Sequence, residues 1–256
     1  MHKLILALAI IFMGPSLTLP ARASIEDERA LAPLIDLQSG GQSTGAAQGA
    51  GATAGGLDNG SLLPDQGRGY ETRGRDEIHW GSGMMISLIV NSAAALANDD
   101  ASSKLYIGSI AKEHGGAFPP HKSHQNGLDA DFLFLGTTSY DSVLDKDGKV
   151  TDAFDLEKNW HYWRMITSQR VRIGESTPSA VSMILVDPRL KTHICSWAEG
   201  RKDQLDALDM EVLKKLRPTE GHDNHFHLRL RCSPYYEECI VEREWRNPPT
   251  GCAGLD

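Results

Sequence analysis

Apolar residues are distributed unevenly along the chain, and their pattern changes at about residue 69. Residues 38–68 are rich in Gly, Ser, Ala and Gln and contain few large apolar side chains. Because so little apolar surface cannot offset the entropy lost on folding, this stretch is predicted to be a flexible linker. It completes an N-terminal segment over residues 24–68, and residues 69–256 have the length of a single globular domain.

Within residues 69–256, the apolar patterns predict a mixture of helices and strands. Helices are expected over residues 82–97, with Ser82 as N-cap, and over residues 152–168 and 203–216. Strands are expected over residues 104–110, 132–135, 180–186 and 225–231. Because strands and helices do not alternate strictly along the chain, their order favours an α+β fold.

The strand expected at residues 225–231 has the clearest alternation. It places His225, His227, Arg229 and Arg231 on one face and apolar side chains on the other. His222 is an odd number of residues from His225, so it cannot join that face on a continuous strand. Residues 221–224 are therefore predicted to form a loop that folds over the histidines.

A second group of histidines and carboxylates precedes the apolar run at residues 132–135, which is predicted to be a central strand buried on both faces. Gly127 permits a tight turn there, so His124 can converge on one ion with either Asp129 or Asp131. The two aspartates would share a strand face, so alternation does not choose between them. Imidazole and carboxylate ligands suit zinc, and three of them with an open fourth position make a hydrolytic site.

The first 23 residues have the form of an export signal. A basic start and a short apolar stretch lead to Ala21-Arg22-Ala23, a small-x-small cleavage site. The apolar stretch is too short to span a bilayer, so no stable membrane insertion is expected after its removal. The formal net charge of −8 disfavours a nucleic-acid partner, which would require a basic face.

All four cysteines lie in the C-terminal third of the chain. An even number in an exported protein favours disulfides over zinc thiolates. Three pairings are possible. The favoured one joins Cys232 to Cys239, because their short separation is easily bridged by a turn around Pro234, and Cys195 to Cys252 as a longer closure.

Two longer strings carry a resemblance to a known family. They are Gly115-Gly-Ala-Phe-Pro-Pro-His121-Lys-Ser-His124-Gln-Asn-Gly127-Leu-Asp129-Ala-Asp131 and Arg217-Pro-Thr-Glu-Gly-His222-Asp-Asn-His225-Phe-His227-Leu-Arg229. In order and internal spacing, both are similar to motifs of the penicillin-insensitive murein endopeptidases. This family belongs to a wider group with the lysostaphin-type and D-Ala-D-Ala metallopeptidases. The resemblance implies a small antiparallel central sheet flanked by helices and long loops.

The resemblance also implies a role for each site residue. One zinc ion per chain would be held by three residues, His124, Asp131 and His227. Two histidines, His225 and His222, would act beside it; His225 is the first choice for the general base, although the sequence does not separate their roles. His121 and Asp129 would lie around these residues, in contact with the substrate or with the ligands.

The implied substrate is peptidoglycan, cleaved in the periplasm at cross-links that typically join D-alanyl to meso-diaminopimelyl residues. A metal-activated water would attack the peptide bond, and β-lactams would not inhibit the reaction because no serine is acylated. Two alternatives remain open. One is a D,D-carboxypeptidase or dipeptidase acting on wall peptides. The other is a non-catalytic wall-binding module, in which His225 would close the zinc site as a fourth ligand.

Overall fold

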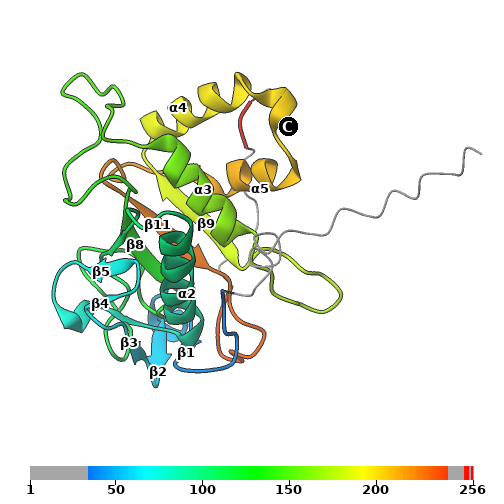
Figure 1. Cartoon of the computed structure of the whole chain (residues 1–256). Helices are drawn as coiled ribbons and strands as arrows, with labels where there is room; N and C mark the ends of the chain where they lie inside the picture. Colours follow the sequence, from blue (N-terminus) through cyan, green and yellow to red (C-terminus); the bar gives the residue numbers. More distant parts are fainter. Residues whose placement is uncertain (1–33, 242–250, 254, 256) are drawn as a thin grey trace, which may run out of the picture. The chain divides into compact units, whose positions relative to one another are not determined.

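The computed structural model describes residues 34–241, 251–253 and 255 (Figure 1). The expected signal peptide, residues 1–23, lies outside the described residues. The central element is a seven-stranded sheet with the strand order β10-β9-β11-β8-β7-β5-β4. Its strands are β4 (Gln66–Gly67), β5 (Tyr70–Thr72), β7 (Leu105–Ile107), β8 (Asp129–Leu133), β9 (Val181–Val186), β10 (Leu216–Pro218) and β11 (His225–Leu230).

The sheet is mixed, which corrects the expectation of a small antiparallel sheet. The neighbours β9, β11, β8 and β7 are antiparallel, whereas β10 runs parallel to β9 and β5 runs parallel to β7. Parallel neighbours need a crossover connection, and helices supply it at both places. Helix α2 (Gly83–Asp99) lies between β5 and β7 in the chain, and α4 (Pro188–Glu199) and α5 (Ala207–Lys215) lie between β9 and β10.

Together with α3 (Leu156–Thr167), these make four α-helices within the described residues, so the α+β class is confirmed. The predicted N-cap is also confirmed, because the Ser82 side chain accepts a hydrogen bond from the Met85 N–H. Helix α4 was missed, although Asp187 as N-cap followed by Pro188 is a recognised start signal. No helix in this part of the chain has the length and apolar character that a bilayer crossing requires.

The structure differs from the linker expected at residues 38–68. Two short antiparallel pairs join β1 (Gln42–Thr44) to β2 (Gly56–Asp58) and β3 (Ser61–Leu62) to β6 (Trp80–Gly81), and β4 belongs to the main sheet. Backbone hydrogen bonds and close approaches take the place of large apolar side chains. Gly45, for example, has a φ of +59°, and a methyl group on it would lie 2.0 Å from the Ala54 carbonyl oxygen.

The apolar core lies on one face of the main sheet. Phe132 of β8 and Phe226 of β11 are register partners, and their rings stack with centroids 5.1 Å apart. Tyr162 and Trp163 of α3 pack against this pair, with α3 and α2 drawn in front of the sheet in Figure 1. Since the core occupies this face, alternation directs the polar residues of β8 and β11 to the opposite face.

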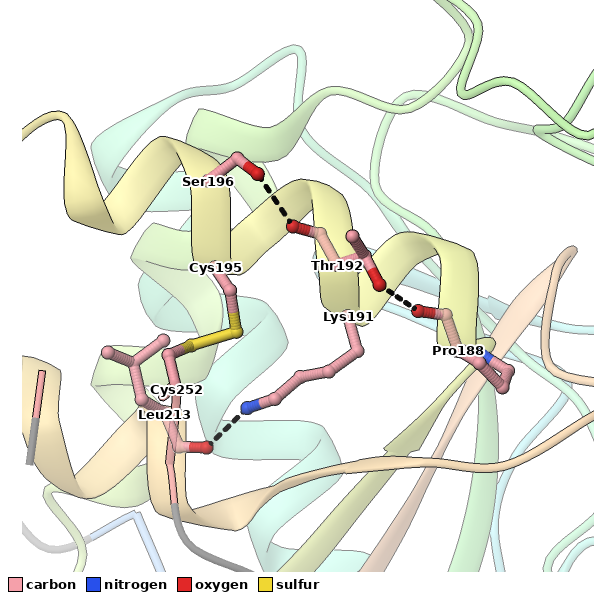
Figure 2. Close-up of a disulfide and its surroundings, with 7 residues drawn as sticks. All are labelled: Pro188, Lys191, Thr192, Cys195, Ser196, Leu213 and Cys252. Carbon is pink, nitrogen blue, oxygen red and sulfur yellow. Dashed lines mark hydrogen bonds between the residues drawn. A yellow bond between two sulfur atoms is a disulfide. The ribbon is translucent and has the colours of Figure 1, made fainter. Parts of the chain in front are cut away.

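Both predicted disulfides are present. Cys195 of α4 is bonded to Cys252, and Cys232 is bonded to Cys239. Figure 2 shows the Cys195–Cys252 bridge beside the Lys191 ammonium, which donates a 2.7 Å hydrogen bond to the Leu213 carbonyl of α5. The bridge therefore attaches the C-terminal residues where α4 and α5 meet.

Candidate metal centre

The pairing of β8 with β11 places the polar residues of the two strands opposite one another. His227 is the register partner of Asp131, and Arg229 is the register partner of Asp129. Cross-strand partners point to the same face, so these four side chains and His225 form one polar surface on the side away from the aromatic core. Both aspartates lie within the strand, which begins earlier than the predicted apolar run.

His124 reaches this surface from a loop. Its backbone has a φ of +63°, a left-handed conformation that costs a non-glycine residue about 1–3 kcal/mol. Two hydrogen bonds hold it there: its backbone N–H donates to Asp129 Oδ2 at 2.8 Å, and its Nδ1 lies 2.8 Å from the Ile110 carbonyl oxygen. Because a carbonyl only accepts, Nδ1 carries the proton and Nε2 is left as a free electron-pair donor.

Three donor atoms converge at the centre of the polar surface. His124 Nε2 lies 3.1 Å from His227 Nδ1 and 3.3 Å from Asp131 Oδ1, and the last two atoms are 3.2 Å apart. Ligands bound at about 2.0–2.1 Å in tetrahedral geometry are separated by about 3.3–3.4 Å. The triangle therefore has the dimensions of a zinc site with a fourth position to spare, and its donor types suit that ion.

His121 lies at the edge of this triangle. Donor atoms of His121, His124 and Asp131 fall within 4.8 Å of one another, so His121 belongs to a second group that could hold a metal. Its Nδ1 is 3.9 Å from Asp131 Oδ2, which is longer than any edge of the first triangle. Its side chain is also more exposed than those of the other two. This geometry favours His227 over His121 as the third ligand and leaves His121 at the rim.

The negative charges around the triangle outnumber the positive charge of Arg229, so one more cation would balance them. Burial would raise the pKa of Asp129, but the Arg229 guanidinium, bonded to both carboxylate oxygens, holds it well below its usual range. Asp131 is also buried, and beside His124 its pKa is well below the usual range. Two buried carboxylates thus face one arginine. Burial disfavours charge on His227, yet Asp129 raises its pKa to about 9, so either a proton or a metal ion balances the site.

Asp129 also orients His227. His227 Nε2 lies 3.0 Å from Asp129 Oδ1, so this ring nitrogen donates to the carboxylate and Nδ1 faces the triangle. A carboxylate behind a ligating histidine fixes its tautomer and raises its basicity. The sequence placed Asp129 near the site and Arg229 on the shared face. It did not reveal that the two bind each other, because 100 residues separate them.

His225 and His222 stand beside the triangle without closing it. His225 Nε2 is 3.7 Å from Asp131 Oδ1, while its Nδ1 donates to Asn224 Oδ1 at 2.5 Å. Burial lowers the pKa of His225 to about 4. The His222 ring centre is 5.0 Å from that of His225, and burial lowers the pKa of His222 as well. Both rings are therefore neutral at pH 7 and able to accept a proton.

The expected loop over the histidines is present, and it contacts a second loop that the sequence did not connect to the site. Asn224 donates from Nδ2 to the Tyr140 carbonyl at 2.9 Å. The Tyr140 ring meets the His225 ring edge to face, with centroids 6.1 Å apart. No local pattern marks Tyr140, because Asn224 and His225, which it contacts, are more than 80 residues away in the chain.

Comparison with known proteins places the chain among relatives of one named family. A family model described as penicillin-insensitive murein endopeptidase matches residues 49–255. Curated relatives with that name include proteins of Haemophilus influenzae, 32% identical over 66% of this chain, and Klebsiella pneumoniae, 30% identical over 81%. A Pectobacterium atrosepticum relative is 26% identical over 74%. The matches span 58% of the Haemophilus protein, 65% of the Pectobacterium protein and 73% of the Klebsiella protein.

Proposed function

The chain belongs to the penicillin-insensitive murein endopeptidase family, and on this premise we propose that it is a zinc-dependent hydrolase of peptide cross-links in peptidoglycan. The observation that carries the proposal is the triangle of His124 Nε2, His227 Nδ1 and Asp131 Oδ1, with edges of 3.1–3.3 Å. The bond cleaved would be the one between D-alanyl and meso-diaminopimelyl residues, in the periplasm. The relatives carry only the name murein endopeptidase, so the metal and the bond are proposals for this chain.

His124, Asp131 and His227 would hold the zinc ion. When bound, zinc supplies Lewis acidity and brings the pKa of a coordinated water toward about 7. The protein contributes the geometry: the Ile110 carbonyl fixes the tautomer of His124, and Asp129 fixes that of His227. Arg229 keeps Asp129 ionised, so the orienting hydrogen bond persists across the working pH range.

His225 would be the general base that takes a proton from the attacking water and returns one to the leaving amine. Its Nε2 is the unprotonated nitrogen because Nδ1 donates to Asn224, and it lies on the Asp131 side of the triangle. His222 would assist. Its Nδ1 lies 3.2 and 3.1 Å from the carbonyl oxygens of Thr219 and Glu220, which leaves Nε2 as an acceptor. His121, partly exposed at the rim, would contact the substrate.

The proposal is tested by digesting purified peptidoglycan with the signal-free protein and identifying the released muropeptides by mass. Cross-linked dimers should be converted to monomers, a chelator should abolish the conversion, and added zinc should restore it. His124→Ala should be inactive, whereas His161→Ala, an exposed histidine on α3, should behave as wild type. Penicillin should neither inhibit the reaction nor label the protein.

Three results would contradict the proposal. Chelator-resistant cleavage would rule out the metal. Release of terminal D-alanine without conversion of dimers would assign the protein to the carboxypeptidases instead. Binding to peptidoglycan without any cleavage by the zinc-loaded protein would point to a wall-binding module.

A further inference from the structure

Tyr140 brings a hydroxyl group to the metal centre from the loop between β8 and α3. Nearly half of the residue is exposed, at 46%, but its ring packs edge to face against His225. Within the residues that the structure describes, the hydroxyl has no hydrogen-bond partner. Among the described residues it is thus a donor without a protein acceptor, beside a ring whose Nε2 also has no hydrogen bond.

The position of the hydroxyl can be read from Gly108, which follows β7. A methyl group on Gly108 would lie 2.0 Å from the Tyr140 hydroxyl oxygen and 3.3 Å from Asp131 Cβ. Gly108 is itself bonded to the strand, through its N–H to the Asp131 carbonyl at 2.8 Å. The hydroxyl therefore fills the space that a side chain at position 108 would take, near Cβ of Asp131, the residue that forms one corner of the triangle.

The loop that carries Tyr140 is hydrogen-bonded to the loop at residues 221–224, which precedes His225. The Tyr140 carbonyl accepts from Asn224, whose other amide atom accepts from His225. Ser142 Oγ donates to Asp223 Oδ2 at 2.5 Å, and the Val143 N–H donates to the Asp223 carbonyl at 2.8 Å. These bonds hold the backbone that carries Tyr140 beside the residues that carry the general-base candidate, His225.

The hydroxyl keeps its proton at any working pH. Burial and, to a lesser degree, the nearby charge of Asp131 raise the pKa of Tyr140 to about 12. A neutral hydroxyl that stays protonated can only help a reaction here as a donor or as a dipole, not as a base.

We propose that the Tyr140 hydroxyl donates a hydrogen bond to the scissile carbonyl oxygen as negative charge develops on it. This inference rests on the proposed endopeptidase function. Its basis is geometric: a donor with no protein acceptor near Asp131, on a loop that is hydrogen-bonded to the residues just before His225. Such a preorganised donor favours the transition state over the ground state, because the carbonyl oxygen gains charge only during attack.

The first test is Tyr140→Phe, which removes the hydroxyl and keeps the ring against His225. Loss of one oxyanion donor typically lowers kcat by about 10²-fold or more, and KM should change by no more than about twofold. Zinc content and thermal stability should equal those of wild type. Tyr235→Phe is the matched control, because this tyrosine is 50% exposed and lies beside Asn91 of α2, away from the centre.

The inhibition constant of a phosphinate analogue of the scissile peptide provides a second readout. A purely structural role of Tyr140 would not change this constant selectively. The tetrahedral oxygens of the analogue imitate the developing oxyanion, so its inhibition constant should rise in Tyr140→Phe by about the factor by which kcat/KM falls. Substrate analogues with a planar carbonyl should bind wild type and variant alike.

Gly108→Ala tests the position of the hydroxyl independently. Its methyl group should displace the hydroxyl and lower kcat in the presence of Tyr140, but should add little to the loss in a Tyr140→Phe background. Equal effects of Gly108→Ala in both backgrounds would contradict the placement of the hydroxyl.

The inference is overturned if Tyr140→Phe keeps wild-type kcat and phosphinate affinity, or if its loss of activity follows loss of zinc or of stability. Failure of the underlying function looks different. Zinc-loaded wild-type protein that leaves cross-linked dimers intact would overturn both proposals, whereas active wild type with an equally active Tyr140→Phe would overturn this one alone.

Discussion

His124 and His227 meet at the same point, but they are held there by different means. His227 lies in the middle of β11, paired to β8 on one side and β9 on the other, so two backbone ladders fix its place. His124 lies in a loop with a φ of +63° and depends on hydrogen bonds to Asp129 and Ile110. A strand position is thus fixed cooperatively with the sheet, whereas a loop position is fixed by a few individual bonds.

One residue connects the two arrangements. Asp129 accepts from the backbone N–H of His124 through one carboxylate oxygen and from the His227 ring through the other. Its own charge is balanced by Arg229. A change at Asp129 is therefore expected to affect both His124 and His227, whereas a change elsewhere in the loop should affect His124 alone.

Removing either ligand should have the largest effect. His124→Ala and His227→Ala should each lose bound zinc and lower kcat/KM by about 10³-fold or more, because metal assistance is worth several kcal/mol. Metal content after dialysis and the dimer-cleavage assay measure both. If His227→Ala retains one zinc and His121→Ala does not, His121 is the third ligand and the choice of triangle is wrong.

The next largest effects are expected at His225 and His222, and the two substitutions should lower kcat to different extents. His225→Ala should lower kcat by about 10²–10⁴-fold as expected for a lost general base, and His222→Ala should have a smaller effect. Burial lowers the pKa of His225 to about 4, so its neutral, proton-accepting form persists well below the usual value of about 6.5. The acid limb of kcat/KM against pH should therefore fall below pH 6.5. A limb at or above that value would contradict His225 as the base.

Asp129→Asn should weaken both ligands at once. We expect zinc affinity to fall by about 10–100-fold, as for other carboxylates behind ligating histidines. Breaking the buried pair with Arg229 should also destabilise the fold by about 3–5 kcal/mol. Chelator competition and denaturant unfolding measure the two effects, with the exposed Asp58→Asn as control. Unchanged zinc affinity would mean that the ligands keep their positions without this carboxylate.

The smallest effect is expected from a substitution that affects only the loop that carries His124. The Gln125 side-chain oxygen Oε1 accepts hydrogen bonds from the backbone N–H groups of Gly49 and Gly55 at 3.2 and 3.1 Å, which attaches the His124 loop to the connection between β1 and β2. Gln125→Ala should lower the free energy of unfolding by about 1–3 kcal/mol and zinc affinity only a few-fold. The exposed Gln66→Ala serves as control. A loss of zinc affinity as large as in Asp129→Asn would show that the loop depends on this contact more than on the carboxylate.

Much of the fold was predictable because it depends on local patterns. The Ser82 cap, the helix at 83–99 and the alternating strand at 225–230 are set by neighbouring residues, and the disulfides were expected from the spacing and even number of the cysteines. Residues 38–68 were misjudged because composition measures apolar side chains and not backbone pairing. The same glycines that suggest flexibility permit the close approaches of β1 and β2.

The sequence patterns also did not predict that the outer strands β10 and β5 run parallel to their neighbours. A strand pattern does not state which neighbour it will join, and the crossovers through α2, α4 and α5 produced parallel pairs at both sides of an antiparallel centre. The contact between Tyr140 and His225 was missed for a similar reason. Both loops look ordinary in the sequence, and only the packing of β8 beside β11 brings them together.

The sequence by itself determined the donor types, their order and which of them share a strand face, because alternation and turn chemistry act between near neighbours. It left Asp129 and Asp131 equivalent. The tertiary structure separated them through the register of β8 and β11, which places Asp131 opposite His227 and Asp129 opposite Arg229. Register is fixed by the pairing of two whole strands and by the core that they share, so residues about 100 positions apart acquire distinct roles only in the folded chain.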